Sequence, residues 1–107
     1  MPELPEVETT RRGIEPHIVG KRIKALHVRQ PKLRWPVPDA IHQAEGKKLQ
    51  AVERRGKYLL FRFSSGTIIA HLGMSGSMRI IAKGEPPMFH DHVDMECSDG
   101  TTLRYCD

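Results

Sequence analysis

The stretch KLQAVERRGKYLLFRFSSGTIIAHL, residues 48–72, decides the fold class of this chain. It holds three short segments, at 48–55, 57–63 and 67–72, of which the last two are largely apolar, and they are separated first by Gly56 and then by Ser64-Ser65-Gly66. Short runs rich in Leu, Ile, Phe and Tyr, bounded by Gly and Ser, are typical of β-strands joined by tight turns. The stretch therefore predicts three consecutive strands.

The residues on both sides extend this β pattern. Before it, 21–29 and 32–35 are expected to be strands, and 36–44 is expected to be a brief helix with Asp39 as its cap. After it, a loop is expected over 83–91, and the expected strands are 77–82, 92–97 and 101–105, the last two forming a hairpin. About eight closely spaced strands are typical of a β-sandwich or a β-barrel.

The first residues predict a helix. Pro5 suits a first helical position, and Glu6 and Glu8 fall in a first turn, where the helix dipole favours carboxylates. Pro16 disfavours helical geometry at Glu15, so we expect the helix to break or kink there. The apolar residues that follow a helical spacing are Val7, Ile14 and Ile18.

The composition indicates one globular domain. With 107 residues, 38% hydrophobic and 28% charged, the chain fits a single core and is not of a disordered type. No apolar run approaches the roughly 18–20 residues that span a bilayer, and the opening lacks the pattern of a secretory signal. Two cysteines are too few for a disulfide scaffold and favour reduced thiols in a cytosolic protein.

The charge is unevenly distributed. The formal net charge is +4, but residues 1–55 hold 12 basic and 7 acidic residues, whereas 56–107 hold 5 and 6. A basic first half suits a polyanion such as nucleic acid. Many basic domains have no such partner, so charge alone does not select this function.

The N-terminus offers a candidate nucleophile. Removal of Met1 would free the secondary amine of Pro2, and an α-amino group has a pKa of roughly 7.7–8.0, so part of it is unprotonated near neutral pH. Such an amine can attack an electrophilic sugar carbon and form an iminium ion. The same dipeptide also begins many proteins without any such chemistry.

Glu3 and Glu6 lie three residues apart at the expected helix start, close enough to face one pocket. One carboxyl group can move protons, while the other stabilises positive charge on a sugar or steadies the nucleophile. Nearby carboxylates also favour the protonated form of Pro2, so a working site needs desolvation or a nearby cation. The alternative role of both residues is to complement the helix dipole.

Three further positions invite a nucleic-acid interpretation. Lys57, at the start of an apolar strand, suits a phosphate contact or proton donation, or it is simply solvated. Met74 stands between Gly73 and Gly76 at a turn tip, where an apolar side chain can wedge into a base stack or can cap the edge of the core. His71, just before this turn, is either a phosphate contact or a core histidine.

The segment Phe89–Asp94 raises the question of a metal site together with Cys97 and Cys106. The spacing matches no structural zinc pattern, so no metal site is expected here. A loop histidine that contacts DNA, His90, is the preferred interpretation.

Taken in chain order, these features resemble the N-terminal domain of the formamidopyrimidine-DNA glycosylase family, bacterial enzymes that excise oxidised purines such as 8-oxoguanine. The related endonuclease VIII branch is less similar, because its opening typically lacks Leu4 and its central turn differs. The segments that carry the match span the whole chain in the family's order: Pro2–Thr9, Arg11–Ile14, Arg54–Leu60, His71–Gly76 and His90–Asp94.

The resemblance implies a mainly β fold with flanking helices, a two-layered β-sandwich of about eight strands with a catalytic helix at the N-terminus. It implies that Pro2 attacks C1′ of a flipped-out nucleotide, that Glu3 transfers protons and that Glu6 supports the site. Lys57 would contact phosphate and assist β-elimination. Elimination on both sides of the abasic sugar would break the strand.

The resemblance also implies contacts with damaged double-stranded DNA. His71 and His90 would contact DNA, and Met74 would fill the space left by the flipped base. Flipping is required because this chemistry cannot occur within an intact base stack. No membrane partner is expected, the full-length family is usually monomeric, and the expected location is the bacterial cytoplasm, at the nucleoid.

Residues 1–107 are expected to be the catalytic domain alone. Family members are more than twice as long and carry a C-terminal helix–two-turn–helix segment and a four-cysteine zinc finger, both absent here. No cofactor is therefore expected in this chain. Because DNA affinity depends on how many phosphates are neutralised, we expect weak activity.

Two other hypotheses remain open. The chain ends abruptly after Cys106-Asp107, directly behind a strand, which is compatible with a non-catalytic DNA-binding or interaction β-domain derived from the same family. A third hypothesis is a structural β-domain whose basic charge is incidental.

Overall fold

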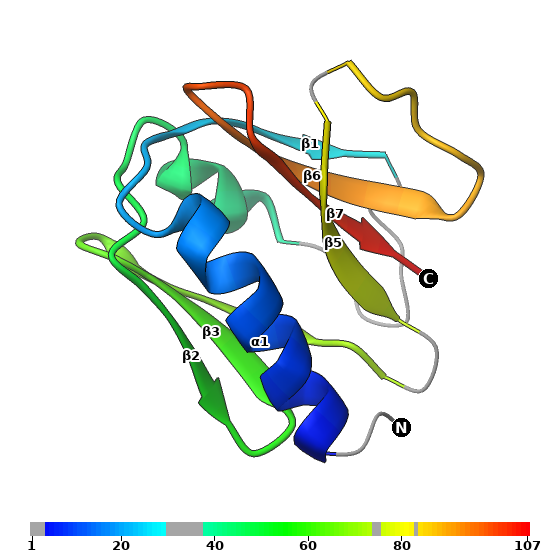
Figure 1. Ribbon diagram of the computed structural model, residues 1–107. Coiled ribbons are helices and arrows are strands. Elements are labelled where there is room, and N and C mark those ends of the chain that lie inside the picture. Colours follow the sequence, from blue (N-terminus) through cyan, green and yellow to red (C-terminus); the bar gives the residue numbers. More distant parts are fainter. Residues whose placement is uncertain (1–3, 30–37, 74–75, 83) are drawn as a thin grey trace.

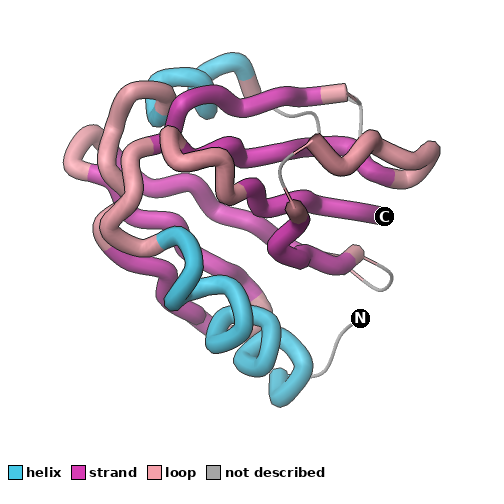
Figure 2. The backbone as a smooth tube through the Cα atoms, turned by 45° about the horizontal axis from the view of Figure 1, so that its top comes forward, coloured by secondary structure: helices cyan, strands magenta, loops and turns pink. Residues whose placement is uncertain are grey.

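The computed structural model describes residues 4–29, 38–73, 76–82 and 84–107, which form two antiparallel β-sheets and two helices (Figure 1). Helix α1 (Leu4–Ile18) packs against β5 of one sheet and β2 of the other. The short 3₁₀ helix η1 (Asp39–Ala44) packs against β1, and the two helices lie on opposite sides of the strands (Figure 2). The described part of the chain is therefore a two-layered sandwich flanked by helices, as expected.

The larger sheet has the strand order β1-β6-β7-β5, and the smaller sheet has the order β2-β3-β4. All five pairings in these sheets are antiparallel. The expected strands outside 32–35 are confirmed with small shifts at their ends, and 32–35 lies outside the described residues. The strand bounds are β1 Ile23–Val28, β2 Ala51–Arg55, β3 Tyr58–Phe63, β4 Gly66–His71, β5 Ser77–Ile81, β6 Asp91–Cys97 and β7 Thr102–Cys106.

Helix α1 does not break at Glu15, so the first of the two predicted alternatives, a break rather than a kink, is wrong. The helix continues through Pro16 to Ile18, and the amide of Val19 still donates to the carbonyl of Glu15 at 3.1 Å. Pro16 stands in the last turn, where its missing N–H removes only the bond to the carbonyl of Arg12, an exposed residue that water can reach. The predicted apolar face is confirmed, since Val7, Ile14 and Ile18 are buried.

The second helix also differs from the prediction. It is a single 3₁₀ segment of six residues, and Pro38 rather than Asp39 occupies the N-cap position, without a side-chain cap hydrogen bond. A proline fixed near φ −71° holds an extended backbone before the helix. Residues 36 and 37 of the expected helix lie outside the described part of the chain.

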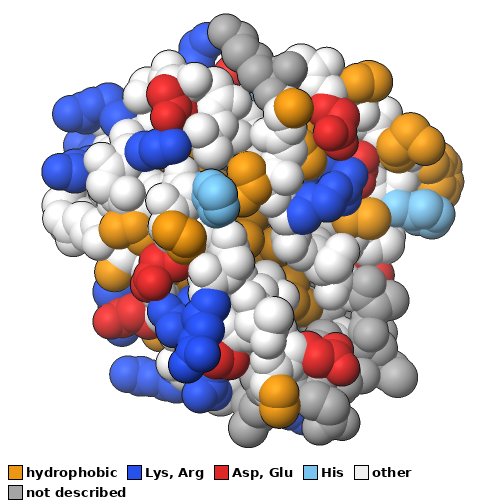
Figure 3. Space-filling model, viewed as in Figure 1, with side chains coloured by type: hydrophobic (Ala, Val, Ile, Leu, Met, Phe, Trp, Pro, Cys, Tyr) orange, Lys and Arg blue, Asp and Glu red, His pale blue; other side chains and the backbone are white. Residues whose placement is uncertain are grey.

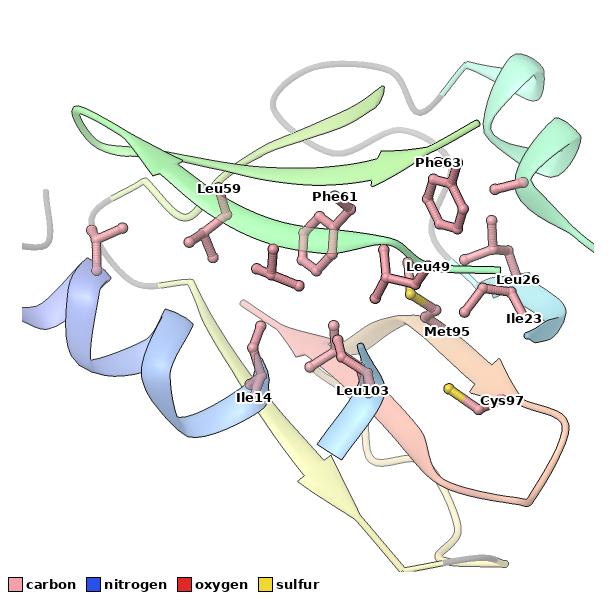
Figure 4. Packing of buried hydrophobic residues seen from close by; sticks show 14 residues of the cluster. Ile14, Ile23, Leu26, Leu49, Leu59, Phe61, Phe63, Met95, Cys97 and Leu103 are labelled. Carbon is pink, nitrogen blue, oxygen red and sulfur yellow. The ribbon is translucent and has the colours of Figure 1, made fainter. Parts of the chain in front are cut away.

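The core lies between the sheets and is closed at one side by α1. Leu59, Phe61 and Phe63 alternate along β3 and point toward the larger sheet, where Met95 and Leu103 meet them (Figure 4). This period-two alternation is what a strand with one buried face requires. The core therefore fixes how the two sheets are stacked and so which strand ends come together.

Candidate functional site

Both sheets bring strand ends to one end of the sandwich. In the smaller sheet, the start of β3 pairs with the end of β4, Tyr58 with His71. In the larger sheet, Cys106 pairs with both Ser77 and Asp91, so the starts of β5 and β6 lie at the same end. A short connection joins β4 to β5, and α1 begins nearby (Figure 1). We use the name site end for the end of the sandwich that holds the starts of α1, β3, β5 and β6 and the end of β4.

A hydrogen-bonded chain joins the start of α1 to the turn between β2 and β3. Arg54 donates through Nε to Glu8 at 3.1 Å and through Nη1 to the carbonyl of Gly56 at 3.0 Å. Glu8 also accepts hydrogen bonds from Arg11 and Arg12. These contacts, with that of Arg11 the largest, lower the pKa of Glu8 to about 2, so its carboxylate is ionised and anchored.

The turn between β2 and β3 presents Lys57. Gly56 has φ 60° at the first of its two central positions, a conformation that glycine adopts without steric cost in hairpin turns. Lys57 follows and is half-buried. Among the described residues, no carboxylate forms an ion pair with its ammonium group. The turn thus holds Lys57 directly before the start of β3.

His71 pairs across the smaller sheet with Tyr58, the residue that follows Lys57. The rings of His71 and Tyr58 have centroids 4.9 Å apart, and Tyr58 is 48% exposed. His71 itself is only partly buried, so it is not a core histidine. The structure therefore pairs His71 with the residue next to Lys57, and both were predicted to contact DNA.

The turn that carries Met74 is constrained by the glycines on both sides. Gly73 has φ 69°, which disfavours other residues. A Cβ atom on Gly76 would lie 2.2 Å from the carbonyl oxygen of Leu72, and the amide of Gly76 donates to that same oxygen at 2.9 Å. Met74 lies outside the described residues, as do Pro2 and Glu3.

Glu6 and His90 occupy other positions of the site end. Glu6 is exposed in the first turn of α1. His90 is exposed just before β6, its ring lies edge-on to that of Phe89 at 4.9 Å, and its carbonyl accepts a hydrogen bond from the amide of Asp107. A surface pocket of about 390 Å³ lies beside it, lined in part by Arg29, His92 and Asp107.

The distribution of charge agrees with the basic first half of the sequence. On the face shown in Figure 3, Lys and Arg side chains gather over the side of α1 and β2, with Asp and Glu side chains among them. Part of this basic charge is thus neutralised internally, as in the cluster of Glu8 with Arg11, Arg12 and Arg54.

The residues considered for a metal site have other roles in the structure. Cys97 is part of the hydrophobic core, and Asp94 binds two arginines. Across the described ranges, no three His, Cys, Asp or Glu side chains are grouped so that they could hold a metal ion.

The analysis of the sequence missed a buried ionic network on the larger sheet. Arg104 is 1% exposed and holds Asp94 with two hydrogen bonds of 2.9 and 3.0 Å, while Arg29 holds the same carboxylate at 2.6 Å. Burial raises the pKa of Asp94, but these hydrogen bonds outweigh it and lower the pKa to about 2. A signal was present, because a hairpin of strands 92–97 and 101–105 closed by a turn at 98–100 would pair position 94 with 104, as the structure does.

Comparison with known proteins gives a consistent result. A family model described as "Formamidopyrimidine-DNA glycosylase N-terminal domain" matches residues 1–107. The chain is 60% identical to the formamidopyrimidine-DNA glycosylases of Saccharophagus degradans and Methylococcus capsulatus, with all of this chain and 40% of each relative covered. It thus spans about two-fifths of the length of these relatives.

Solved structures of similar proteins share the fold. One is the Lactococcus lactis formamidopyrimidine DNA glycosylase bound non-covalently to DNA that contains an abasic site, with a TM-score of 0.89 and 36% identity over 99% of this chain and 41% of that one. Another is MutM in complex with DNA containing carbocyclic 8-oxo-G, with a TM-score of 0.87 and 38% identity over 99% of this chain and 41% of that one. No helix among the described residues is long and apolar enough to cross a membrane.

Proposed function

The chain belongs to the formamidopyrimidine-DNA glycosylase family, and we propose that it acts on damaged double-stranded DNA in base excision repair, removing oxidised purines such as 8-oxoguanine and formamidopyrimidines. One observation carries this proposal. Glu6 lies in the first turn of α1, Lys57 precedes β3, His71 ends β4 and His90 precedes β6, so each of them stands at an element end that the strand pairing directs to the site end.

The proposed nucleophile is Pro2, with Met1 removed. Its nitrogen forms a bond to C1′ while the bond from C1′ to the damaged base breaks, and the departing base takes up a proton. Opening of the sugar ring then gives an iminium ion, an electron sink that acidifies the protons on C2′. Loss of a C2′ proton expels the 3′ phosphate, and a second elimination expels the 5′ phosphate, which is the proposed lyase activity.

Glu3 and Glu6 are the proposed carboxyl groups of this chemistry. Glu3 transfers protons to and from the sugar, and Glu6 stabilises the positive charge that develops on the nucleotide. The first turn of α1 presents Glu6 to solvent, and the anchoring of Glu8 by Arg54 holds this turn against the β2–β3 hairpin. The backbone that carries Glu6 is thus held in place by the contact between Glu8 and Arg54.

Lys57, His71, His90 and Met74 are the proposed DNA contacts. Lys57 binds a phosphate and assists β-elimination, and the two histidines bind backbone phosphates. Met74 fills the space that the flipped nucleotide leaves, a role in which an apolar side chain replaces lost base stacking. The absence of an ion pair to Lys57 within the described residues supports its phosphate role.

The activity proposed for this chain is weak, and its location is the bacterial cytoplasm, at the nucleoid. Residues 1–107 span 40% of the length of these relatives, and affinity for DNA grows with the number of phosphates neutralised, so weak activity is proposed for these residues taken alone. For the same reason, a non-catalytic DNA-binding module is the second candidate. We propose no cofactor for this chain, and no step is assigned to a metal.

Borohydride trapping tests the proposal. The chain is incubated with a duplex that contains an abasic site, and borohydride is added to reduce any iminium to a stable adduct. We expect a covalent protein–DNA adduct once intact mass shows that Met1 is removed. If DNA binds but no adduct forms, the binding module is the correct function.

A further inference from the structure

The loop that precedes β6 folds back over the outer face of the larger sheet. Its backbone is held there by Arg104 of β7, whose guanidinium donates to the carbonyl of Glu85 at 3.0 Å and to that of Pro86 at 3.2 Å. Because the loop covers it, Arg104 is buried although it lies on the outer side of a two-layer fold. The loop is therefore held against the sheet by hydrogen bonds.

The same arginine reaches a tight turn that contains His90. Arg104 lies 3.5 Å from the carboxylate of Asp91, which is 2% exposed. That carboxylate accepts a hydrogen bond of 2.8 Å from the amide of Met88, and the amide of Asp91 donates back to the carbonyl of Met88 at 3.0 Å. Asp91 therefore closes the turn from both directions.

His90 is fixed on its other side by the end of β7. The amide of Asp107 donates to the carbonyl of His90 at 2.9 Å, and Nε2 of His92 lies 2.8 Å from the carbonyl oxygen of Asp107. The backbone of His90 is thus held between Asp91 and Asp107, while its ring remains exposed. An exposed side chain on an anchored backbone is what a preorganised binding contact requires.

The charges of this network are satisfied internally. Arg104, Arg79 and Arg29 pair with Asp91, Asp94 and Glu85, three cations with three anions. Breaking one member of a buried pair leaves an uncompensated charge, so an outside phosphate cannot draw Arg104 away cheaply. Arg104 is buried and engaged, and it cannot itself be a DNA contact.

We infer that Asp91 and Arg104 are positioning residues for His90, and that they set the strength of the phosphate contact that His90 makes. This inference rests on the proposed function, in which His90 binds a DNA phosphate. It assigns a role in DNA binding to an acidic side chain, Asp91, although the phosphates of DNA repel its negative charge.

The sign of that charge gives a sharp test. Replacing Asp91→Ala removes a negative charge, so electrostatics alone predicts tighter binding to DNA. The positioning role predicts weaker binding, by about tenfold, the effect of one lost charge-assisted hydrogen bond. Binding of a duplex with a tetrahydrofuran abasic-site analogue is measured by fluorescence anisotropy over a series of salt concentrations.

The expected result includes a change in the salt dependence. The slope of log K against log salt should change for Asp91→Ala in the same way as for His90→Ala, because both variants lose the same phosphate contact. The double variant should bind no more weakly than His90→Ala alone. The matched control is Asp99→Ala, which removes an exposed carboxylate from the far end of the β6–β7 hairpin and should leave the slope unchanged.

Arg104→Lys is the second variant in case Asp91→Ala does not fold. It keeps the positive charge but loses the guanidinium that reaches the two loop carbonyls and the two carboxylates at once. The same weaker binding and the same salt dependence as for His90→Ala are expected. Tighter or unchanged DNA binding by Asp91→Ala or Arg104→Lys would overturn the positioning role. The role would also be overturned if the losses of affinity of Asp91→Ala and His90→Ala add in the double variant. If His90→Ala itself binds like the parent, the DNA contact of the proposed function is what fails.

Discussion

Glu8 of α1 and Arg54 of β2 are joined by a hydrogen bond of 3.1 Å that ties the start of the helix to the smaller sheet. Arg54 also holds the carbonyl of Gly56, the residue before Lys57. The helix that presents Glu6 and the turn that presents Lys57 are therefore positioned by one arginine. This pair connects the proposed proton chemistry to the proposed phosphate contact.

Glu8→Gln should lower the melting temperature at neutral pH and slow strand cleavage, because the neutral amide binds three arginines less strongly. The folded pKa of Glu8 is about 2, below its ordinary value of 4.5. Its stabilising effect is thus present above about pH 4.5 and is lost as the pH falls toward 2. Melting temperatures of parent and variant should draw closer as the pH falls over this range, and a difference as large at pH 2 as at neutral pH would contradict the assignment.

Asp94→Ala should lower the free energy of unfolding by about 3–5 kcal/mol, because it leaves Arg104 buried without its main partner. The pKa of Asp94 is about 2 in the folded chain, below the ordinary 3.8. Its stabilisation is therefore lost as the pH falls from about 4 toward 2. Urea denaturation measures both effects. The exposed control Glu53→Gln should change stability by less than about 0.5 kcal/mol.

Gly76→Ala should distort the turn that carries Met74, because the new Cβ would lie 2.2 Å from the carbonyl oxygen of Leu72. We expect weaker binding to abasic-site DNA and a lower melting temperature. The matched control is Gly13→Ala in α1, where nothing lies within 4 Å of the added methyl group. That variant should be more stable by about 0.5–1 kcal/mol and should bind DNA like the parent.

Lys57→Ala should reduce the salt slope of DNA binding by about 0.9, because one phosphate is no longer neutralised. Cleavage of an abasic strand should slow by about 10²-fold or more if Lys57 assists elimination. Lys47→Ala, an exposed lysine before the opposite end of β2, provides the control. An equal effect of the two variants would show that Lys57 contributes only general basic charge.

Local features of the sequence predicted much of this fold. The apolar spacing of Val7, Ile14 and Ile18 identified the buried face of α1, and the glycine and serine turns placed the strand ends to within a few residues. These features depend on neighbours along the chain, which the sequence displays directly. The prediction of a helix break at Glu15 failed because the burial of Ile18 in the core outweighs the cost of one proline in the last turn of the helix.

The arrangement in space was harder to predict. Pairing of β1 with β6 joins residues about 70 positions apart, and no local pattern specifies it. The burial of Arg104 was missed because arginine is normally exposed, and only the fold-back of the 84–90 loop covers it. For the site, the register of β3 and β4 pairs His71 with Tyr58, the residue after Lys57, and this register differs by one residue from the one that a turn over Ser64-Ser65-Gly66 would give. Their roles in catalysis and DNA binding stay predictions.

The identity of the trapped peptide tests the central claim most directly. After borohydride trapping on abasic-site DNA, the adduct is digested with trypsin, and mass spectrometry locates the DNA remnant. The account predicts that it is attached to the peptide that begins at Pro2 and ends at Arg11, with Met1 removed. Attachment to the peptide that contains Lys57, or trapping that continues after the terminal nitrogen is acetylated, would contradict it.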